Sequence, residues 1–333
     1  MNSIIYFGYF LKTTNYSELL NYIKKVNTVK RISYFHMIID MLISSFKYKA
    51  SFEDYFVFRF YEKTRKERYK YVTTGKIYEF HKKMNSKQDR EIFRKKNIFN
   101  KVFKQFIKRD YLYINGNNYH DFERWVSTKK QFIAKPNEGV IGKGIRKIDV
   151  TSYSSYKDIF DYLINNNLHL VEEIIMQHKK MNELNPTSVN TIRVITILKN
   201  ENVHIIGALL RMSKGNIVDN LASGGIAAPI DLDTGKVFRP AVSKDCFVRE
   251  YYEHPITGHR IKDFEIPYWK DIISMVEKAA KVVRGIKTVG WDIAVTEYGP
   301  ELIEGNDNWC KTLWQIPYQE GKSHLLEKIE LEE

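Results

Sequence analysis

The first third of the chain carries apolar residues at steps of three and four positions. This spacing is typical of amphipathic helices, and it is clearest over residues 16–26 and 34–46. Residues 51–85 mix aromatic side chains with lysine and arginine at a helix-compatible spacing, and the first proline is Pro136. We therefore predict a mainly helical region over residues 16–107, whose short helices turn basic faces to the solvent.

The pattern changes near residue 131, where short runs rich in isoleucine and valine alternate with asparagine, glycine, proline and aspartate. Such runs are typical of β-strands separated by turns. The predicted strands are residues 131–136, 144–150, 168–175, 191–199, 203–212, 290–297 and 300–306. Two helices are expected between them, over residues 154–167 and 268–285, the second ending at a glycine cap. The second part of the chain is thus predicted to be an α+β domain.

Composition and charge add to this division. With 43% apolar and 14% aromatic residues in 333 positions, the chain is expected to be globular, with about two domains. The 53 lysines and arginines exceed the 40 aspartates and glutamates by 13. Residues 1–130 hold 28 basic and 12 acidic side chains (+16), and residues 131–333 hold 25 and 28 (−3). The excess lies in the N-terminal region, where it could guide a polyanionic acceptor or rest on an anionic membrane surface.

Cysteine content and hydropathy indicate the compartment. The two cysteines, Cys246 and Cys310, cannot form a disulfide framework or a four-ligand zinc site. No signal-peptide pattern opens the chain. The longest apolar run, residues 37–46, contains Asp40 and is about half the length that spans a bilayer. We expect a cytoplasmic protein without a transmembrane helix, and peripheral association with the inner face of the membrane stays open.

The most informative segment is residues 290–306, which is predicted to form two strands around a turn at residues 298–300. If this hairpin is symmetric about Tyr298, Asp292 lies opposite Glu304, and Asn306 shares their face because side chains alternate along a strand. Two facing carboxylates destabilise a sheet unless a cation lies between them. An Asp, Glu and Asn set suits Mg²⁺. The alternative is an ordinary polar hairpin face.

A second candidate site is the glycine-containing connection that follows Lys135. Its glycines at 139, 142 and 144 and Lys143 could bring backbone N–H groups and positive charge to phosphate oxygens. It is not a Walker A loop, which joins a strand to a helix. A structural hairpin loop is the alternative.

A third set of polar residues is spread over the central strands. The strand that runs into Glu172 and Glu173 offers a carboxylate and main-chain groups for a purine edge. Arg193 and Arg211 are suited to multi-donor contacts with phosphate or carboxylate. Asn220 follows in a glycine-containing loop. Each of these residues, taken alone, could be structural.

Taken together, these residues occur in an order that resembles the ATP-grasp superfamily of carboxylate–amine ligases, over about residues 90–315. More narrowly, the chain resembles the sugar-transfer-associated ATP-grasp proteins encoded with capsular and exopolysaccharide genes. The segments that carry this resemblance are SFEDYFVF, LNPTSVNTIRVIT, DNLASGGIAAPIDLDTGKV, HPITGH and GWDIAVTEYGPELIEGN.

The resemblance implies an α+β fold in which two subdomains hold ATP between antiparallel sheets, next to the basic helical N-terminal region. The boundaries it implies are 1–95 for that region, 96–170 and 171–320 for the two subdomains, and 321–333 for a tail. Two departures from the family pattern are the lack of an acidic ribose ligand at residues 176–178 and the lack of a Rossmann-like N-terminal domain.

The resemblance also implies a role for each candidate residue. Those assigned to the nucleotide are Lys96 (with Lys95 nearly equal) and Lys135 at phosphate, Gly142, Lys143 and Gly144 over the β- and γ-phosphates, and Glu172, Glu173, Ile174 and Ile175 at the adenine. Those assigned to phosphoryl transfer are Arg211 at the γ-phosphate and Arg193 and Asn220 at the transfer centre or the acceptor carboxylate. Asp292, Glu304 and Asn306 would hold two Mg²⁺ ions, with Mn²⁺ as an alternative.

The expected activity is ATP-dependent ligation of a carboxylate to an amine through an acyl phosphate. The expected substrates are a small-molecule or glycan-linked carboxylate, such as a uronic acid of a polysaccharide precursor, and an amino acid or other amine. The main alternative is a phosphotransferase acting on a sugar or polyol hydroxyl. A nucleic-acid-binding protein is a third possibility, but it leaves the acidic hairpin unexplained, and no specific nucleic acid is expected.

Overall fold

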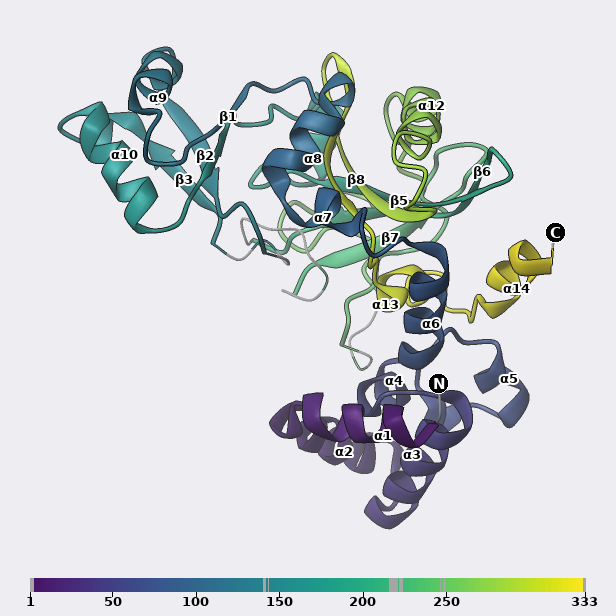
Figure 1. The fold of residues 1–333 in the computed structure, drawn as a ribbon. Coiled ribbons are helices and arrows are strands. Elements are labelled where there is room, and N and C mark those ends of the chain that lie inside the picture. The colour runs from purple at the N-terminus through teal and green to yellow at the C-terminus, as the bar shows by residue number, and fades with distance from the viewer. Residues whose placement is uncertain are drawn as a thin grey trace.

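The computed structural model describes residues 3–139, 142, 144–215, 221, 224–245, 247 and 250–331. Within them the chain forms an N-terminal helical lobe, a lobe built on a four-stranded sheet, and a lobe built on a five-stranded sheet (Figure 1). Both sheets are antiparallel. The predicted α+β class and the helical N-terminal region are confirmed.

The N-terminal lobe is made of short helices whose starts are fixed by side-chain caps. Asn15, Ser33, Ser51 and Thr64 each accept a hydrogen bond from the backbone N–H three residues later, which satisfies one of the free donors of the first helical turn. The core of this lobe is formed by residues 6–71. The helices of the first 102 residues are α1 (Ser3–Thr13), α2 (Tyr16–Lys30), α3 (Tyr34–Tyr48), α4 (Phe52–Val57), α5 (Arg65–Tyr69), α6 (Thr74–Met84), α7 (Arg90–Arg94) and α8 (Lys96–Val102).

The four-stranded sheet has the order β1-β4-β2-β3. Its strands are β1 (Tyr111–Tyr113), β2 (Gln131–Lys135), β3 (Arg146–Asp149) and β4 (Leu170–Glu172), and its helices are α9 (Tyr119–Val126) and α10 (Tyr156–Asn165). The predicted strand over residues 168–175 is shorter than expected, because after Glu172 the chain leaves this sheet and reaches the other one, where Gln177 pairs with Thr296. The expected subdomain boundary at residue 170 falls within β4.

The five-stranded sheet has the order β7-β6-β5-β8-β9. Its strands are β5 (Thr191–Lys199), β6 (Asn202–Met212), β7 (Ile226–Ile230), β8 (Thr288–Thr296) and β9 (Gly299–Asn306). One face packs on α8 and on α12 (Trp269–Ala279), and part of the other face packs on α6, α13 (Lys311–Gln315) and α14 (Ser323–Leu331). The rest of that second face carries polar residues. The sequence pattern missed β7, and α12 ends before the expected Gly285 because only turns follow Ala279.

The predicted hairpin over residues 290–306 is present with the predicted pairing of Asp292 and Glu304. The turn differs, because β9 already begins at Gly299 and Thr296 pairs with Gly299. A register shift after Asp292 compensates for this difference, so the carboxylates still face each other. Such a bulge inserts one extra residue in one strand.

Ion pairs and hydrogen bonds join the N-terminal lobe to the rest of the molecule. Lys311 of α13 lies 2.8 Å from the buried carboxylate of Asp54, and Lys244 pairs with Glu53. The Gln315 side chain bonds both backbone polar groups of Val72. No helix within the described residues is both long and apolar enough to cross a membrane.

Buried His81 of α6 gives the fold a predictable pH dependence. Burial, with the charge of Arg90, lowers the pKa of His81 to about 3, whereas an unfolded histidine titrates near 6.5. Because the unfolded state binds the extra proton between these values, stability falls as the pH drops below about 6.5. We expect wild type to lose about 2–3 kcal/mol more than His81→Gln between pH 6.5 and 4.5. Urea unfolding at both pH values measures this, and equal losses would contradict it.

Candidate active site

The polar residues of the five-stranded sheet gather around Asp292. This carboxylate, on β8, is buried and lies directly opposite Arg193 on β5 and Glu304 on β9. Asn306 Nδ2 lies 3.4 Å from Asp292 Oδ2 and 3.4 Å from Glu304 Oε1. The three oxygen-bearing side chains predicted to converge therefore do so, on one face of the sheet.

Two arginines hold Asp292 in place. Arg193 donates to both of its oxygens, at 2.6 Å from Nε and 2.7 Å from Nη2, and Arg211 Nη1 donates to Oδ1 at 2.7 Å. Both guanidinium groups are buried. The resemblance assigns Arg193 and Arg211 to phosphoryl transfer, and in the structure both are paired with Asp292, the predicted metal ligand.

The close packing of the Trp309 and Arg193 side chains explains the glycine beside this cluster. A Cβ atom on Gly290 would lie 2.7 Å from the Cβ of Trp309 and 3.2 Å from the Cδ of Arg193. Any larger residue would push the Arg193 guanidinium away from Asp292. Gly290 therefore positions the cluster through the space that it leaves open.

The two facing carboxylates have opposite pKa shifts. Burial alone would raise the pKa of Asp292, but Arg193 and Arg211 outweigh it and hold the pKa well below its usual range. Burial raises the pKa of Glu304, and the charge of Asp292 raises it further, against the smaller effects of Arg193, Lys135 and Lys96. Glu304 is thus the carboxylate whose ionised form would gain most from an added cation.

The structure distinguishes the two lysines that the sequence left nearly equal. Lys96 Nζ donates to Gly139 O at 3.1 Å, and burial lowers its pKa in a surrounding that includes Glu304, Lys135 and Glu172. Lys95 instead points to an exposed partner, Glu91. Lys96 therefore lies at the site, together with Lys135.

The glycine connection between β2 and β3 lies next to Lys96. Gly139, Gly142 and Gly144 all have positive φ values, of 131°, 69° and 83°, a conformation that side chains disfavour. The carbonyl oxygen of Gly139 accepts the hydrogen bond from Lys96 Nζ. Two predicted site residues, Lys143 and Asn220, lie outside the described residues.

Arg109 is a site residue that the sequence did not indicate. It is almost fully buried and joins the two sheets, with Nε 3.1 Å from Glu172 of β4 and Nη1 3.1 Å from Glu301 of β9. It also donates to Leu302 O at 2.7 Å. The sequence shows only an arginine in a basic region, and the strand that follows it, β1, was not predicted, so its partners were not predictable.

Glu172 is the centre of this link. Its carboxylate accepts hydrogen bonds from Asn100 Nδ2 at 3.0 Å and from Arg109, and it lies 2.7 Å from Lys135 Nζ. Burial opposes ionisation, but Arg109 and Lys135 lower the pKa of Glu172 well below its usual range. The carboxylate expected at the adenine amino group is therefore engaged in holding Lys135 and Arg109.

The segment after Glu172, which is expected to be a hinge between the sheets, belongs to no helix or strand over residues 173–176. Glu173 pairs with Lys129 and accepts from the Asp110 backbone N–H, and Ile174 and Ile175 are half-buried outside any strand. Gln177 is buried and committed to the backbone of Asn185, Ser188 and Asn190.

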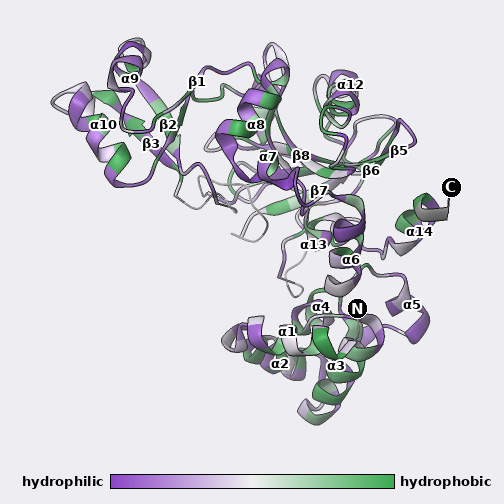
Figure 2. Ribbon diagram, in the orientation of Figure 1, coloured by the Kyte–Doolittle hydropathy of each residue, from purple (hydrophilic) through white to green (hydrophobic). Residues whose placement is uncertain are grey.

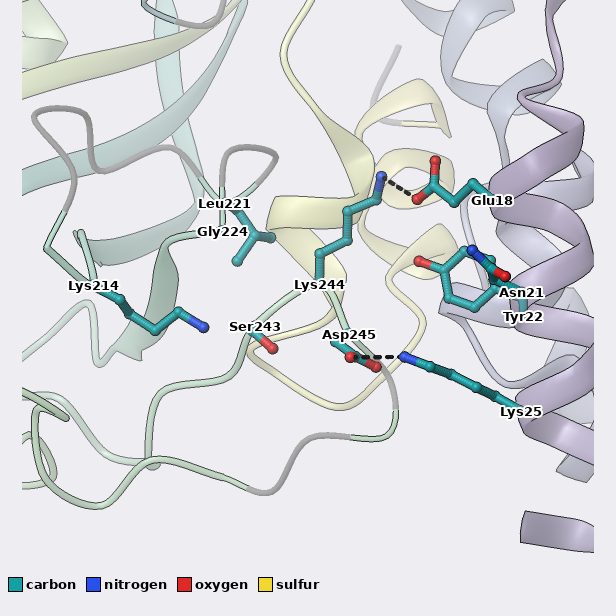
Figure 3. A pocket seen from close by; sticks show the side chains of 10 residues that line it. All are labelled: Glu18, Asn21, Tyr22, Lys25, Lys214, Leu221, Gly224, Ser243, Lys244 and Asp245. Carbon is teal, nitrogen blue, oxygen red and sulfur yellow. Dashed lines mark hydrogen bonds and ion pairs between the residues drawn. The ribbon is translucent and has the colours of Figure 1, made fainter. Parts of the chain in front are cut away.

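A cavity of about 370 Å³ lies between α2 and the loops that follow β6 and β7. Figure 3 shows α2 residues on one side and Lys214 on the other, with Lys25 paired to Asp245 and Lys244 to Glu18. Lys214 Nζ lies 3.3 Å from the hydroxyl of Tyr251. It follows Arg211 by three residues, so the Cα atoms of the two residues are at most about 11 Å apart.

The side chains of Asp292, Glu304 and Asn306 fit a metal ion that a bound substrate also helps to coordinate. Within the part of the chain that the structure describes, no group of three or more His, Cys, Asp or Glu is arranged to hold an ion. Asp292, Glu304 and Asn306 supply two carboxylates and one amide. Mg²⁺ is commonly bound by one or two carboxylates together with substrate phosphates, so these residues fit it when a polyphosphate is present.

Comparisons with solved structures find similar folds. The chain is similar to the ATP-grasp ligase PsnB complexed with minimal precursor, at 15% sequence identity and a TM-score of 0.41, covering 68% of this chain and 56% of PsnB. An L-amino acid ligase from Bacillus licheniformis has 14% sequence identity and a TM-score of 0.40, covering 65% of this chain and 41% of the ligase. An N5-carboxyaminoimidazole synthetase from Staphylococcus aureus complexed with ADP has 10% sequence identity and a TM-score of 0.44, covering 73% of this chain and 53% of the synthetase. The chain spans less than two thirds of the length of each of the three.

Comparison with protein families gives the decisive match. No curated protein sequence matches the chain. Residues 77–331 match the family described as sugar-transfer associated ATP-grasp, which is more than three quarters of the 333 residues. The match includes both sheets and every described candidate site residue. The expected family and ATP-grasp fold are therefore confirmed: the chain belongs to the sugar-transfer-associated ATP-grasp family.

Proposed function

We propose that this protein is an ATP-dependent carboxylate–amine ligase whose site lies between the two sheets. The observation that carries the proposal is the convergence of Asp292, Glu304 and Asn306 opposite Lys96 and Lys135. Carboxylates on one side and lysines on the other suit a metal-bound triphosphate, because the metal neutralises some phosphate oxygens and the lysines contact others.

The chain's own residues then have distinct tasks. Lys96 and Lys135 bind phosphate oxygens, and the glycine connection brings backbone N–H groups over them. Glu172 holds Lys135, and Arg109 links Glu172 to Glu301 of the other sheet around the nucleotide. Bound Mg²⁺ would neutralise charge on the β- and γ-phosphates, and Asp292, Glu304 and Asn306 would hold it.

The proposed reaction has two steps. A carboxylate oxygen of the acceptor attacks the γ-phosphorus of ATP, the bond to the bridging oxygen breaks, and ADP leaves with the electron pair. The amine nitrogen then attacks the carbonyl carbon of the acyl phosphate and expels phosphate while losing a proton. Arg193 and Arg211 would stabilise the charge on the transferring phosphoryl group, because fixed guanidinium groups need no reorganisation during the reaction.

The test of this activity is the dependence of product formation on both co-substrates. With Mg–ATP and a panel of uronic acids, ADP release should require the carboxylate, and hydroxylamine as the amine should yield a hydroxamate. ADP release with a sugar that has only hydroxyl groups, without hydroxamate from any carboxylate, would instead identify a phosphotransferase.

A matched pair of lysine variants tests the nucleotide site. Lys96→Met should weaken Mg–ATP binding roughly 10- to 100-fold, the range of a lost charge-assisted hydrogen bond. Lys95→Met should change it less than about twofold, because this exposed lysine pairs with Glu91. Isothermal titration of both variants measures the difference. Equal affinities would remove Lys96 from the site.

We further propose that the cavity beside Lys214 binds the acceptor. Lys214→Ala should raise the KM for the carboxylate roughly tenfold or more, because a lysine paired with an anion is lost, while the KM for ATP stays within about twofold. Lys281→Ala, at an exposed lysine in the turn that follows α12, serves as the control. A change in the KM for ATP alone would indicate that Lys214 contacts the nucleotide instead.

We base the proposed substrate class on the family and not on the site geometry. We propose that the carboxylate belongs to a polysaccharide precursor, either free or joined to a nucleotide or lipid carrier, and that the reaction takes place in the cytoplasm. Three lysines and two carboxylates are among the described residues that line this cavity, and the small excess of positive charge supports an anionic acceptor of this kind.

A further inference from the structure

Exposed apolar side chains are concentrated on the first three helices. Among the described residues, 23 large apolar side chains are exposed, and 13 of them lie between residues 4 and 46. Figure 2 shows hydrophobic residues along α3 and on part of α1. Exposed apolar patches of this kind on a soluble domain mark interaction surfaces.

On α3 these side chains form one continuous outer stripe. Phe35, Ile39, Ile43 and Phe46 recur at steps of four, four and three, so they lie above one another on the helix surface. Their exposed fractions are 75%, 40%, 51% and 43%. The opposite side of α3 is already buried in the lobe through residues such as Met37, Met41 and Tyr48. The outer stripe is therefore not needed for the core of the lobe.

Helix α1 extends this surface. The ring of Phe7 stacks on that of Phe46, with centroids 4.7 Å apart, so the two helices are in contact at the end of the stripe. Ile4, Ile5 and Tyr9 of α1 are exposed by 66%, 56% and 56%. We call the exposed apolar residues of α1 and α3 the outer apolar face.

The charges around the outer apolar face are mainly positive. Residues 3–48 contain six lysines and arginines and only two acidic residues, Glu18 and Asp40. Asp40 is neutralised by Arg68 at 2.6 Å. Lys12 lies in the last turn of α1 and Lys47 in the last turn of α3, and both are exposed. An apolar surface bordered by cations is complementary to a bilayer surface that contains anionic lipids.

We propose that the outer apolar face inserts into the interface of an anionic lipid bilayer. The apolar side chains of α1 and α3 enter the boundary between headgroups and acyl chains, and the bordering lysines contact lipid phosphates. The attachment is peripheral, consistent with the absence of a membrane-crossing helix among the described residues. Helix α2 lines the cavity beside Lys214, so the same lobe would hold that cavity near the membrane surface. This proposal does not depend on the chemistry of the ligase site.

Sedimentation with lipid vesicles tests the proposal on the full chain. Binding to vesicles of phosphatidylcholine with 30% phosphatidylglycerol should exceed binding to pure phosphatidylcholine roughly tenfold or more, at about 1 kcal/mol per lysine or arginine at the surface, and should weaken in high salt. Replacing Phe35, Ile39 and Ile43 by serine should reduce the partition coefficient at least tenfold. Their exposure keeps the fold intact, which thermal unfolding verifies.

A matched variant controls for general loss of hydrophobicity. Leu232→Ser, Tyr252→Ser and Val282→Ser remove three exposed apolar side chains elsewhere and should leave vesicle binding unchanged. Equal binding by both triple variants and wild type would overturn the proposal. So would a wild-type dimer that the α3 variant converts to monomer without any change in vesicle binding, because the face would then be an interface between two copies.

Discussion

Asp292→Asn is expected to lower the rate of ADP release by roughly 10³-fold. The substitution removes the charge that would hold the metal and leaves the charge of the γ-phosphate less neutralised, and the loss of one such electrostatic contact commonly costs this much. It also leaves Arg193 and Arg211 without their buried carboxylate. Breaking a buried pair in this way destabilises a protein by about 3–5 kcal/mol, so the melting temperature should fall as well.

Two measurements separate these effects. ADP release is measured at a temperature where circular dichroism shows the variant to be folded, and nucleotide binding is measured at the same temperature. Glu297→Gln is the control, since Glu297 lies in the turn of the same hairpin and is half-exposed. Near-normal turnover by folded Asp292→Asn would refute the role of Asp292 as a metal ligand.

Arg109→Met is expected to lower the free energy of unfolding by about 3–5 kcal/mol, because it removes the arginine that pairs with two buried carboxylates. Glu172 and Glu301 both lie within 3.1 Å of this guanidinium, and Lys135 can compensate only the first. The two sheets lose a direct link at the same time, so the affinity for Mg–ATP should also fall.

The control for this prediction is Arg124→Met on α9. Arg124 forms a single exposed ion pair with Asp121, and such pairs contribute about 0–1 kcal/mol. Urea unfolding of both variants gives the comparison. A loss below about 1 kcal/mol for Arg109→Met would mean that the buried carboxylates find other partners.

The carboxylate hairpin could be predicted because its information is local. Side chains alternate along a strand, and one turn sets the pairing of both strands, so Asp292 and Glu304 were placed opposite each other from sequence alone. The turn itself was placed incorrectly, and the pairing survived only because a bulge restores the register. Local patterns likewise predicted α2, α3, β5 and β6.

The buried ion network could not be predicted, because it depends on contacts between distant segments. Arg109 meets Glu172 and Glu301 over separations of 63 and 192 positions, and no periodic pattern connects them. The contacts of Arg193 and Arg211 with Asp292 could not be predicted either, since the sequence led us to expect a ligand as the partner of these arginines. The choice of Lys96 over Lys95 also required three-dimensional information, since it depends on the direction in which α8 begins.

These contacts suggest how the site responds to nucleotide. Arg193 and Arg211 neutralise Asp292, and burial next to Asp292 raises the pKa of Glu304. We expect a bound metal to replace the arginines at Asp292 and to favour the ionised form of Glu304. The freed guanidinium groups would then be available to the γ-phosphate.

The most direct test of the central claim is a crystal structure of the protein with Mg²⁺ and the non-hydrolysable ATP analogue AMP-PNP. The account predicts the triphosphate between the two sheets, with Lys96 and Lys135 at its oxygens and with Mg²⁺ bound by Asp292, Glu304 and Asn306. Arg193 or Arg211 should have moved from Asp292 toward the γ-phosphate. A nucleotide bound elsewhere, or one bound here while Asp292 stays paired with both arginines and holds no metal, would contradict it.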